Sequence, residues 1–257
     1  MTEAQRFLFD LQGFLLIEDA LTPEEVAAYT RTVYALAHEK VPDAEQWDAR
    51  GEPKHTIRVH RPIEKDPCIL DLVDHPAVLP ILQELVGEAP ILIDNDVELT
   101  PRHDHAHGWH RGVGTHGYWA RDGRFFCTMV KCIWYLSDIG PGENPTRIVP
   151  GSHKSLMKEP KPEGGPGGYL PGQVELYVKA GTVLIFSEAC LHAGNVNPSD
   201  KTRVNMYFNY GPSWVQPWEG YRPSQRLVDE AEGIRKQILG GGRIYSTTAE
   251  EGERIYR

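Results

Sequence analysis

The longest β-like run of the chain is Phe125-Phe126-Cys127-Thr128-Met129-Val130-Lys131-Cys132-Ile133-Trp134-Tyr135-Leu136. Its β-branched and aromatic residues favour the centre of a buried sheet. Shorter strand-like segments separated by turn signals lie on both sides of it, at residues 13–17, 54–61, 90–99, 173–178, 181–186 and 203–210. The middle of the chain therefore predicts an all-β sandwich or barrel.

Helical patterns flank this β region. Thr22-Pro23-Glu24-Glu25 supplies an N-cap, a proline for the first turn and the glutamate of a capping box, so a helix is expected from there to about Lys40. Further helices are expected at residues 2–13, 76–86 and 224–239, and residues 141–172 are expected to be mostly loop. The 257 residues thus predict a single α+β domain with a mainly β core and helices at both ends.

Composition excludes several classes of protein. A net charge of −9 argues against a nucleic-acid polymer as partner, because phosphate binding needs a basic face. The chain has neither an apolar run of about 18 residues nor a basic and apolar leader, so we expect no membrane association and a cytoplasmic location. The four cysteines form no C-x-x-C pair, which predicts reduced thiols rather than a zinc or redox motif.

Two stretches carry histidines in a pattern that indicates a metal. Residues 103–112 (HDHAHGWHRG) hold four of the eleven histidines, and imidazole suits iron, zinc, copper and nickel alike. In residues 180–195 a glycine turn opens a buried strand that ends near His192. Arg203 follows His192 by eleven residues, at the start of another strand.

Three motifs between about residues 109 and 210 together resemble the phytanoyl-CoA dioxygenase family of Fe(II)- and 2-oxoglutarate-dependent oxygenases. They are Trp109-His110, the loop 142–154 with its Pro-Gly-Ser-His sequence, and the spacing from His192 to Arg203. The resemblance implies a double-stranded β-helix (a cupin-like jelly roll) that uses Fe(II), 2-oxoglutarate and O2. It further implies that His110 and His192 bind iron and that Arg203 pairs with the far carboxylate of 2-oxoglutarate. Trp134 is a candidate second contact with this cosubstrate, and a tryptophan packed in the core is the alternative.

The chain departs from the family at one ligand. An Asp or Glu is expected at position 112, where this sequence has Gly112. Three explanations are open. The protein is an inactive relative without iron, or Asp104, His107 or His116 replaces the ligand in an ordinary hydroxylase. In the third, the position is left open for chloride, as in the similar iron-dependent halogenases that carry Gly or Ala there. We favour a halogenase, because both histidines and the arginine are retained.

Basic and aromatic residues near the predicted mouth of the site indicate the substrate. Arg111, Arg58 and Arg61 predict an anionic small molecule, and Trp119 is expected to stack on a flat ring. Resemblance to nucleotide halogenases of antibiotic pathways favours chlorination at the 2′ carbon of a deoxyadenosine monophosphate. A free amino acid, an alkaloid-like molecule and a non-catalytic binding protein with solvated arginines stay open. A carrier protein is not expected, because no docking patch stands out in the terminal helices.

Overall fold

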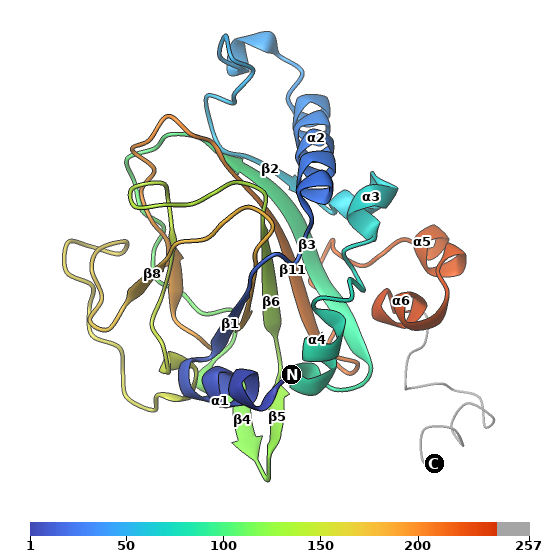
Figure 1. The fold of residues 1–257 in the computed structure, drawn as a ribbon, viewed down its shortest axis with the longest axis vertical. Helices are drawn as coiled ribbons and strands as arrows, with labels where there is room; N and C mark the ends of the chain where they lie inside the picture. Colours follow the sequence, from blue (N-terminus) through green and yellow to red (C-terminus); the bar gives the residue numbers. More distant parts are fainter. Residues whose placement is uncertain (241–257) are drawn as a thin grey trace.

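The computed structural model describes residues 1–240 and has two antiparallel sheets at its centre. The larger sheet has six strands in the order β1-β9-β6-β11-β3-β2, and the smaller one has three in the order β10-β7-β8. The hairpin β4-β5 extends from one end of the molecule (Figure 1). The predicted α+β architecture with a mainly β core is confirmed.

The elements have the following bounds. The helices are α1 (Glu3–Gln12), α2 (Pro23–Lys40), α3 (Pro67–Leu70), α4 (Leu79–Val86), α5 (Gln225–Glu230) and α6 (Gly233–Ile238). The strands are β1 (Phe14–Ile17), β2 (Ile57–His60), β3 (Pro90–Thr100), β4 (Tyr118–Arg121), β5 (Arg124–Cys127), β6 (Val130–Tyr135), β7 (Thr146–Ile148), β8 (Val174–Leu176), β9 (Val183–Ser187), β10 (His192–Gly194) and β11 (Arg203–Pro212). Within the described residues, no helix combines the length and apolarity needed to cross a membrane.

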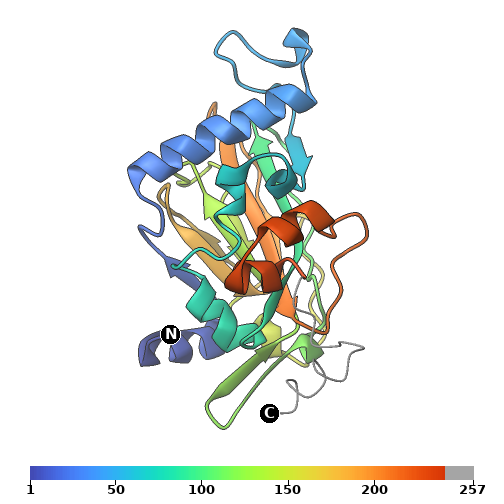
Figure 2. The ribbon, with the colours of Figure 1, turned by 90° about the vertical axis from the view of Figure 1, so that its right-hand side faces the viewer.

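Helices α2 to α6 cover one face of the six-stranded sheet, and the three-stranded sheet lies on the other side (Figures 1 and 2). Strand β6 shows how the sequence produces this layering, because successive side chains of a strand point to opposite faces. Cys132 and Trp134 join the helix-side core, whereas Ile133 and Tyr135 join the core between the sheets. Both faces of β6 are therefore buried, which explains its nearly continuous apolar sequence.

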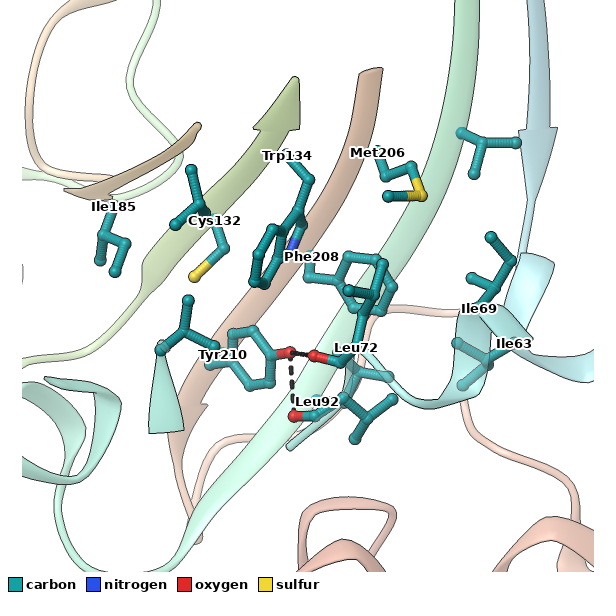
Figure 3. Packing of buried hydrophobic residues seen from close by; sticks show 14 of the residues in the cluster. Ile63, Ile69, Leu72, Leu92, Cys132, Trp134, Ile185, Met206, Phe208 and Tyr210 are labelled. Carbon is teal, nitrogen blue, oxygen red and sulfur yellow. Dashed lines mark hydrogen bonds between the residues drawn. The ribbon is translucent and has the colours of Figure 1, made fainter. Parts of the chain in front are cut away.

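The helix-side core is tied to the sheet by Tyr210 of β11. Its side chain is fully buried beside Phe208, and its hydroxyl donates a 3.0 Å hydrogen bond to the carbonyl of Val73 in the linker before α4 (Figure 3). A buried phenol that finds a backbone acceptor avoids the cost of an unpaired polar group. The linker is thereby fixed against the sheet.

Most predicted elements are present. The differences are segments predicted as one strand or one helix that the structure divides in two, since the periodicity of apolar residues does not predict such interruptions. Thr22 and Glu25 form the predicted capping box, and α2 ends at Lys40 as expected. The long run 125–136 is divided between β5, which forms a hairpin with β4, and β6, which joins the large sheet. The helix predicted at 224–239 is divided into α5 and α6, because Ala231 adopts an extended conformation. The end predicted at Gly240-Gly241-Gly242 lies partly outside the described residues.

The pairing of β3 with β11 positions the site. These strands run antiparallel from Arg203 opposite Thr100 to Pro212 opposite Pro90. On β11, Val204, Met206 and Phe208 belong to the helix-side core, so the alternate residues face the smaller sheet. Those alternate residues are polar, which places hydrophilic side chains inside the sandwich.

Candidate active site

A cavity of about 160 Å³ lies between the two sheets, and it brings together the residues that the sequence singled out. His110, His192 and Arg203 all line it, although they come from a loop, from β10 and from β11. His107 also lines the cavity. Residues separated by more than ninety positions thus share one site.

The two histidines are held side by side by their own backbone. The amide of His110 donates to the carbonyl of His192 at 3.1 Å, and the amide of His192 donates back to His110 at 3.0 Å. Their ring centroids lie 4.2 Å apart, with the planes tilted by 54°. His192 is buried and His110 is exposed at the mouth of the cavity.

Hydrogen bonds fix the tautomer of both rings. Nδ1 of His110 lies 2.9 Å from the carbonyl oxygen of Gly108, and Nδ1 of His192 lies 3.1 Å from that of Cys190. Because a carbonyl only accepts, each Nδ1 donates its hydrogen and each Nε2 keeps a lone pair. Burial lowers the pKa of His192 to about 3, so this ring is neutral near pH 7. Both imidazoles are prepared to bind a metal through Nε2.

A carboxylate fills the space beside Gly112, and it comes from Glu188. A Cβ atom on Gly112 would lie 2.8 Å from the Glu188 carboxyl carbon and 3.1 Å from its Cβ. Oε2 of Glu188 accepts a 2.9 Å hydrogen bond from the Gly112 amide and lies 3.9 Å from Nε2 of His192. The sequence predicted that the space beside Gly112 is open for chloride. That prediction is wrong for this structure, because the Glu188 side chain fills the space.

Glu188 is ionised although it is buried. Burial alone would raise the pKa of its carboxyl, but the ion pair with Lys131 outweighs this cost and holds the pKa below its usual range. Sequence reasoning missed Glu188. The available signal was a lone acid in an otherwise apolar block, four residues before His192.

The three side chains fit a divalent metal by chemistry, since two imidazoles and one carboxylate form the facial set of non-haem iron enzymes. Ligands about 2.1 Å from one ion and at right angles to each other lie about 3 Å apart. The 3.9 Å between Glu188 and His192 is wider, and no three His, Cys, Asp or Glu side chains in residues 1–240 already close around one point. Metal binding would draw these side chains together.

The residues proposed from sequence as replacement ligands lie elsewhere. Asp104 is fully exposed to solvent. His116 is exposed in a short 3₁₀ segment next to Gly114. His107 lines the cavity near Arg203, and burial lowers its pKa. Among the acidic side chains of residues 1–240, Glu188 is the one placed against Gly112.

Arg203 is a buried cation that lacks an anion. It forms no ion pair with a carboxylate of the described residues, and its guanidinium donates to Thr146 Oγ1 at 2.9 Å and to Asn144 Oδ1 at 3.3 Å. The hydroxyl of Tyr135 lies 2.8 Å from the same Thr146 Oγ1. A buried guanidinium without a counter-ion is costly, so this corner is suited to an anionic ligand.

Trp134 was predicted to contact 2-oxoglutarate, and this prediction is wrong, because its side chain does not reach the corner formed by Arg203 and Thr146. Its side chain is fully buried in the helix-side core, near Met206 and Phe208 (Figure 3). Since side chains alternate along β6, Tyr135 faces the Arg203 corner in its place.

The four residues predicted to contact the substrate have other partners. Arg58 lines the cavity but pairs with Glu98 at 2.6 Å. Arg61 binds Glu64 at 3.0 Å, and Arg111 binds Glu159 at 2.6 Å and donates to two backbone carbonyls. Trp119 stacks on Phe126 in the β4-β5 hairpin and does not line the cavity. The basic patch predicted from sequence is therefore internally neutralised, which removes its support for a nucleotide.

Known proteins share this fold. The HygX protein of Streptomyces hygroscopicus, solved with nickel and 2-oxoglutarate bound, superposes with a TM-score of 0.74 at 22% identity and covers 85% of this chain and 90% of its own. The epimerase SnoN, solved with Fe3+, alpha ketoglutarate and nogalamycin RO, gives a TM-score of 0.60 at 18% identity, covering 82% and 83%. The predicted double-stranded β-helix is thereby confirmed.

Sequence relatives agree with the structural ones. Ectoine dioxygenase of Nocardia farcinica (strain IFM 10152) is 23% identical over 228 residues, which are 78% of this chain and 75% of the relative. The pattern of the phytanoyl-CoA dioxygenase (PhyH) family matches residues 9–205, more than two thirds of the chain and all of the site residues described above. The chain therefore belongs to the phytanoyl-CoA dioxygenase family.

Proposed function

We propose that this protein is an Fe(II)- and 2-oxoglutarate-dependent oxygenase that oxidises a small molecule, with His110, His192 and Glu188 as the iron ligands. The observation that carries the proposal is the Glu188 carboxylate, which fills the space left by Gly112 and faces Nε2 of His192. A glutamate reaching from the β9-β10 turn thus restores the carboxylate that position 112 lacks. The proposal keeps the replacement-ligand explanation but assigns a different residue to it.

Each remaining part of the site has a role in this function. Bound iron supplies the oxidising chemistry, in which O2 and 2-oxoglutarate are consumed and succinate and CO2 are released. Arg203, with the hydroxyls of Thr146 and Tyr135, forms the anion site suited to the far carboxylate of 2-oxoglutarate. Lys131 holds the other oxygen of Glu188, so that Oε2 is directed toward the histidines.

The relatives support both the cosubstrate and the size of the substrate. HygX has been solved with nickel, 2-oxoglutarate and hygromycin B, and SnoN, from nogalamycin biosynthesis, with alpha ketoglutarate and nogalamycin RO. A small molecule is therefore bound in each of these structures. By analogy we assign a small-molecule substrate to this chain.

Chlorination is the second candidate, and Gly112 is the observation that favours it. The halide would need the space that Glu188 now fills, so the Glu188 side chain would have to leave its pairing with Lys131 and the Gly112 amide. Breaking a buried pair in this way costs about 3 to 5 kcal/mol. Because of this cost, we favour an oxygenase with Glu188 as ligand over a halogenase.

The test uses the full chain loaded with Fe(II) without oxygen and then given 2-oxoglutarate and O2. The wild type should bind about one iron and form succinate without added chloride. Glu188→Ala should lose most of both, whereas Glu219→Ala, at an exposed glutamate away from the cavity, should retain both. Full iron content and turnover in Glu188→Ala would remove this residue from the site. Succinate formation that depends on chloride would support the halogenase, and a wild type that forms no succinate would support a binding protein.

A further inference from the structure

The wall of the cavity formed by β3 is acidic. Asp94, Asp96 and Glu98 alternate along this strand and all line the cavity. Each is less than a tenth exposed. Three buried carboxylates on one strand need cations or donors opposite them, because burying an unpaired charge is costly.

The cations of the cavity are already assigned to other groups. Arg58 binds Glu98 through two nitrogens at 2.7 and 2.6 Å, and Lys131 binds Glu188. Arg203 lies in the anion corner beside Thr146. Arg58 is shared, because its Nη1 also lies 4.0 Å from Oδ2 of Asp96, so within the described residues Asp94 is the β3 carboxylate left without an ion pair.

The two remaining carboxylates differ in their partners. Asp96 accepts from Tyr221 at 3.0 Å and contacts Nδ1 of His60 at 2.8 Å. Asp94 forms no ion pair with any of the described residues and is bound only by the amide nitrogen of Asn209, at 2.9 and 2.8 Å. Burial raises the pKa of Asp94 to about 6, because it outweighs the opposing effects of the Asn209 amide and of the charge on Lys131.

Asn209 adds an independent observation. Its side chain is 2% exposed and lines the cavity, and its Oδ1 has no hydrogen-bond partner. The orientation of the amide is fixed, because Nδ2 must face the two oxygens of Asp94. An orphaned acceptor beside an unpaired carboxylate calls for a ligand that donates hydrogen bonds and carries positive charge.

We propose that Asp94 and Asn209 form an amine subsite and that the substrate is a small molecule with an ammonium group. The inference rests on the proposed function, since it names the substrate class of the same cavity. Trp218, half exposed and lining the same cavity, adds an aromatic face suited to an ammonium or its adjoining carbons. The amine replaces the anionic substrate predicted from the arginines.

Matched ligand pairs test the subsite without relying on any variant. Metal-free protein is titrated by calorimetry with glucosamine and glucose, lysine and hydroxynorleucine, and cadaverine and pentanediol, so that amines cannot coordinate iron. At least one amine should bind about 10-fold or more tightly than its hydroxyl partner, the usual gain of a charge-assisted contact over a neutral one. A panel in which no amine exceeds its partner overturns the proposal.

Variants locate the effect. Asp94→Asn and Asn209→Ser should each reduce that preference about 10-fold or more, whereas Asp200→Asn, at a carboxylate 77% exposed, should keep it. An amine preference that survives both cavity variants also overturns the proposal. The two proposals fail separately: amine binding without succinate formation removes the oxygenase, and succinate formation stimulated equally by amine and hydroxyl partners removes the subsite.

Discussion

Oε2 of Glu188 lies 3.9 Å from Nε2 of His192, four residues further along the chain. Glu188 directly follows β9 and His192 begins β10, so the turn between the two strands brings these two proposed iron ligands together. The backbone of His192 pairs with that of His110, which adds the third ligand. In this arrangement the strand end supplies the carboxylate that position 112 lacks. The glycine is then a steric requirement, because a side chain there would meet Glu188.

Gly112→Ala should destabilise the fold by about 1 to 3 kcal/mol, because overpacking a filled site forces its neighbours to move. The added Cβ would lie 2.8 Å from the carboxyl carbon of Glu188, which is held by Lys131. Denaturant unfolding measures the loss. Gly108→Ala is the control, since its Cβ would come no closer than 3.7 Å to Pro166. Equal losses in the two variants would contradict the steric role of Gly112.

Moving the carboxylate back to position 112 should restore iron binding. Glu188→Ala opens the space, and Gly112→Asp then places a carboxylate in it, so the double variant should hold more iron than Glu188→Ala alone. Gly112→Asp by itself should bind iron no better than the wild type, because Glu188 still fills the space. The measurement is iron per chain after removal of free metal. Strictly additive effects of the two substitutions would show that the positions do not share a ligand role.

Arg203→Met should weaken 2-oxoglutarate binding about 30-fold or more, the usual cost of removing one side of a buried charge pair. Arg203→Lys should also weaken it, because an ammonium lacks the planar fork. Without ligand, Arg203→Met should keep thermal stability or gain some, since Arg203 has no anionic partner among the described residues and removing it relieves a buried charge. The readouts are the 2-oxoglutarate concentration needed for half-maximal succinate formation and the melting temperature with and without 2-oxoglutarate. An unchanged requirement would remove Arg203 from the cosubstrate site.

Two neighbouring residues on β6 should give opposite results. Tyr135→Phe removes a hydroxyl from the Arg203 corner and should weaken 2-oxoglutarate binding by up to about 10-fold, the value of one hydrogen bond. Trp134→Phe removes volume from the helix-side core, so it should lower unfolding free energy by about 1 to 3 kcal/mol and leave 2-oxoglutarate binding unchanged. Titration calorimetry and denaturant unfolding separate the two effects. The reverse pattern would mean that the faces of β6 are misassigned.

His153 should make stability depend on pH. It is fully buried under α1, and burial lowers its pKa from 6.5 to about 4. Below pH 6.5 the unfolded chain takes up a proton that the folded chain refuses, so stability should fall by about 2 to 3 kcal/mol as the pH drops from 6.5 to about 4. His153→Gln should flatten this part of the curve. His55→Gln, at an exposed histidine, should leave the slope as it is, and a slope unchanged in both variants would exclude His153 as its source.

The sequence by itself determined the elements and the spacing of the main site residues. Capping chemistry fixed where α2 begins, because Thr22 and Glu25 satisfy orphan amides locally. The order of strands placed His192 and Arg203 at the beginnings of separate strands. These features depend on residues that are near one another in the chain.

Only the tertiary structure decided which side chains meet. Glu188 and Gly112 are far apart in sequence, and no local pattern reports that one fills the space beside the other. Alternation along β6 could not choose a face for Trp134, because both faces are buried and both are largely apolar. From sequence alone the arginines indicated a basic patch, because the pairing of Arg58 with Glu98 on the neighbouring strand β3 forms only in the folded sheet. Which charges are neutralised and which spaces are filled depends on contacts between residues far apart in the chain. The charge of the cavity wall formed by β3 is therefore decided by the tertiary structure.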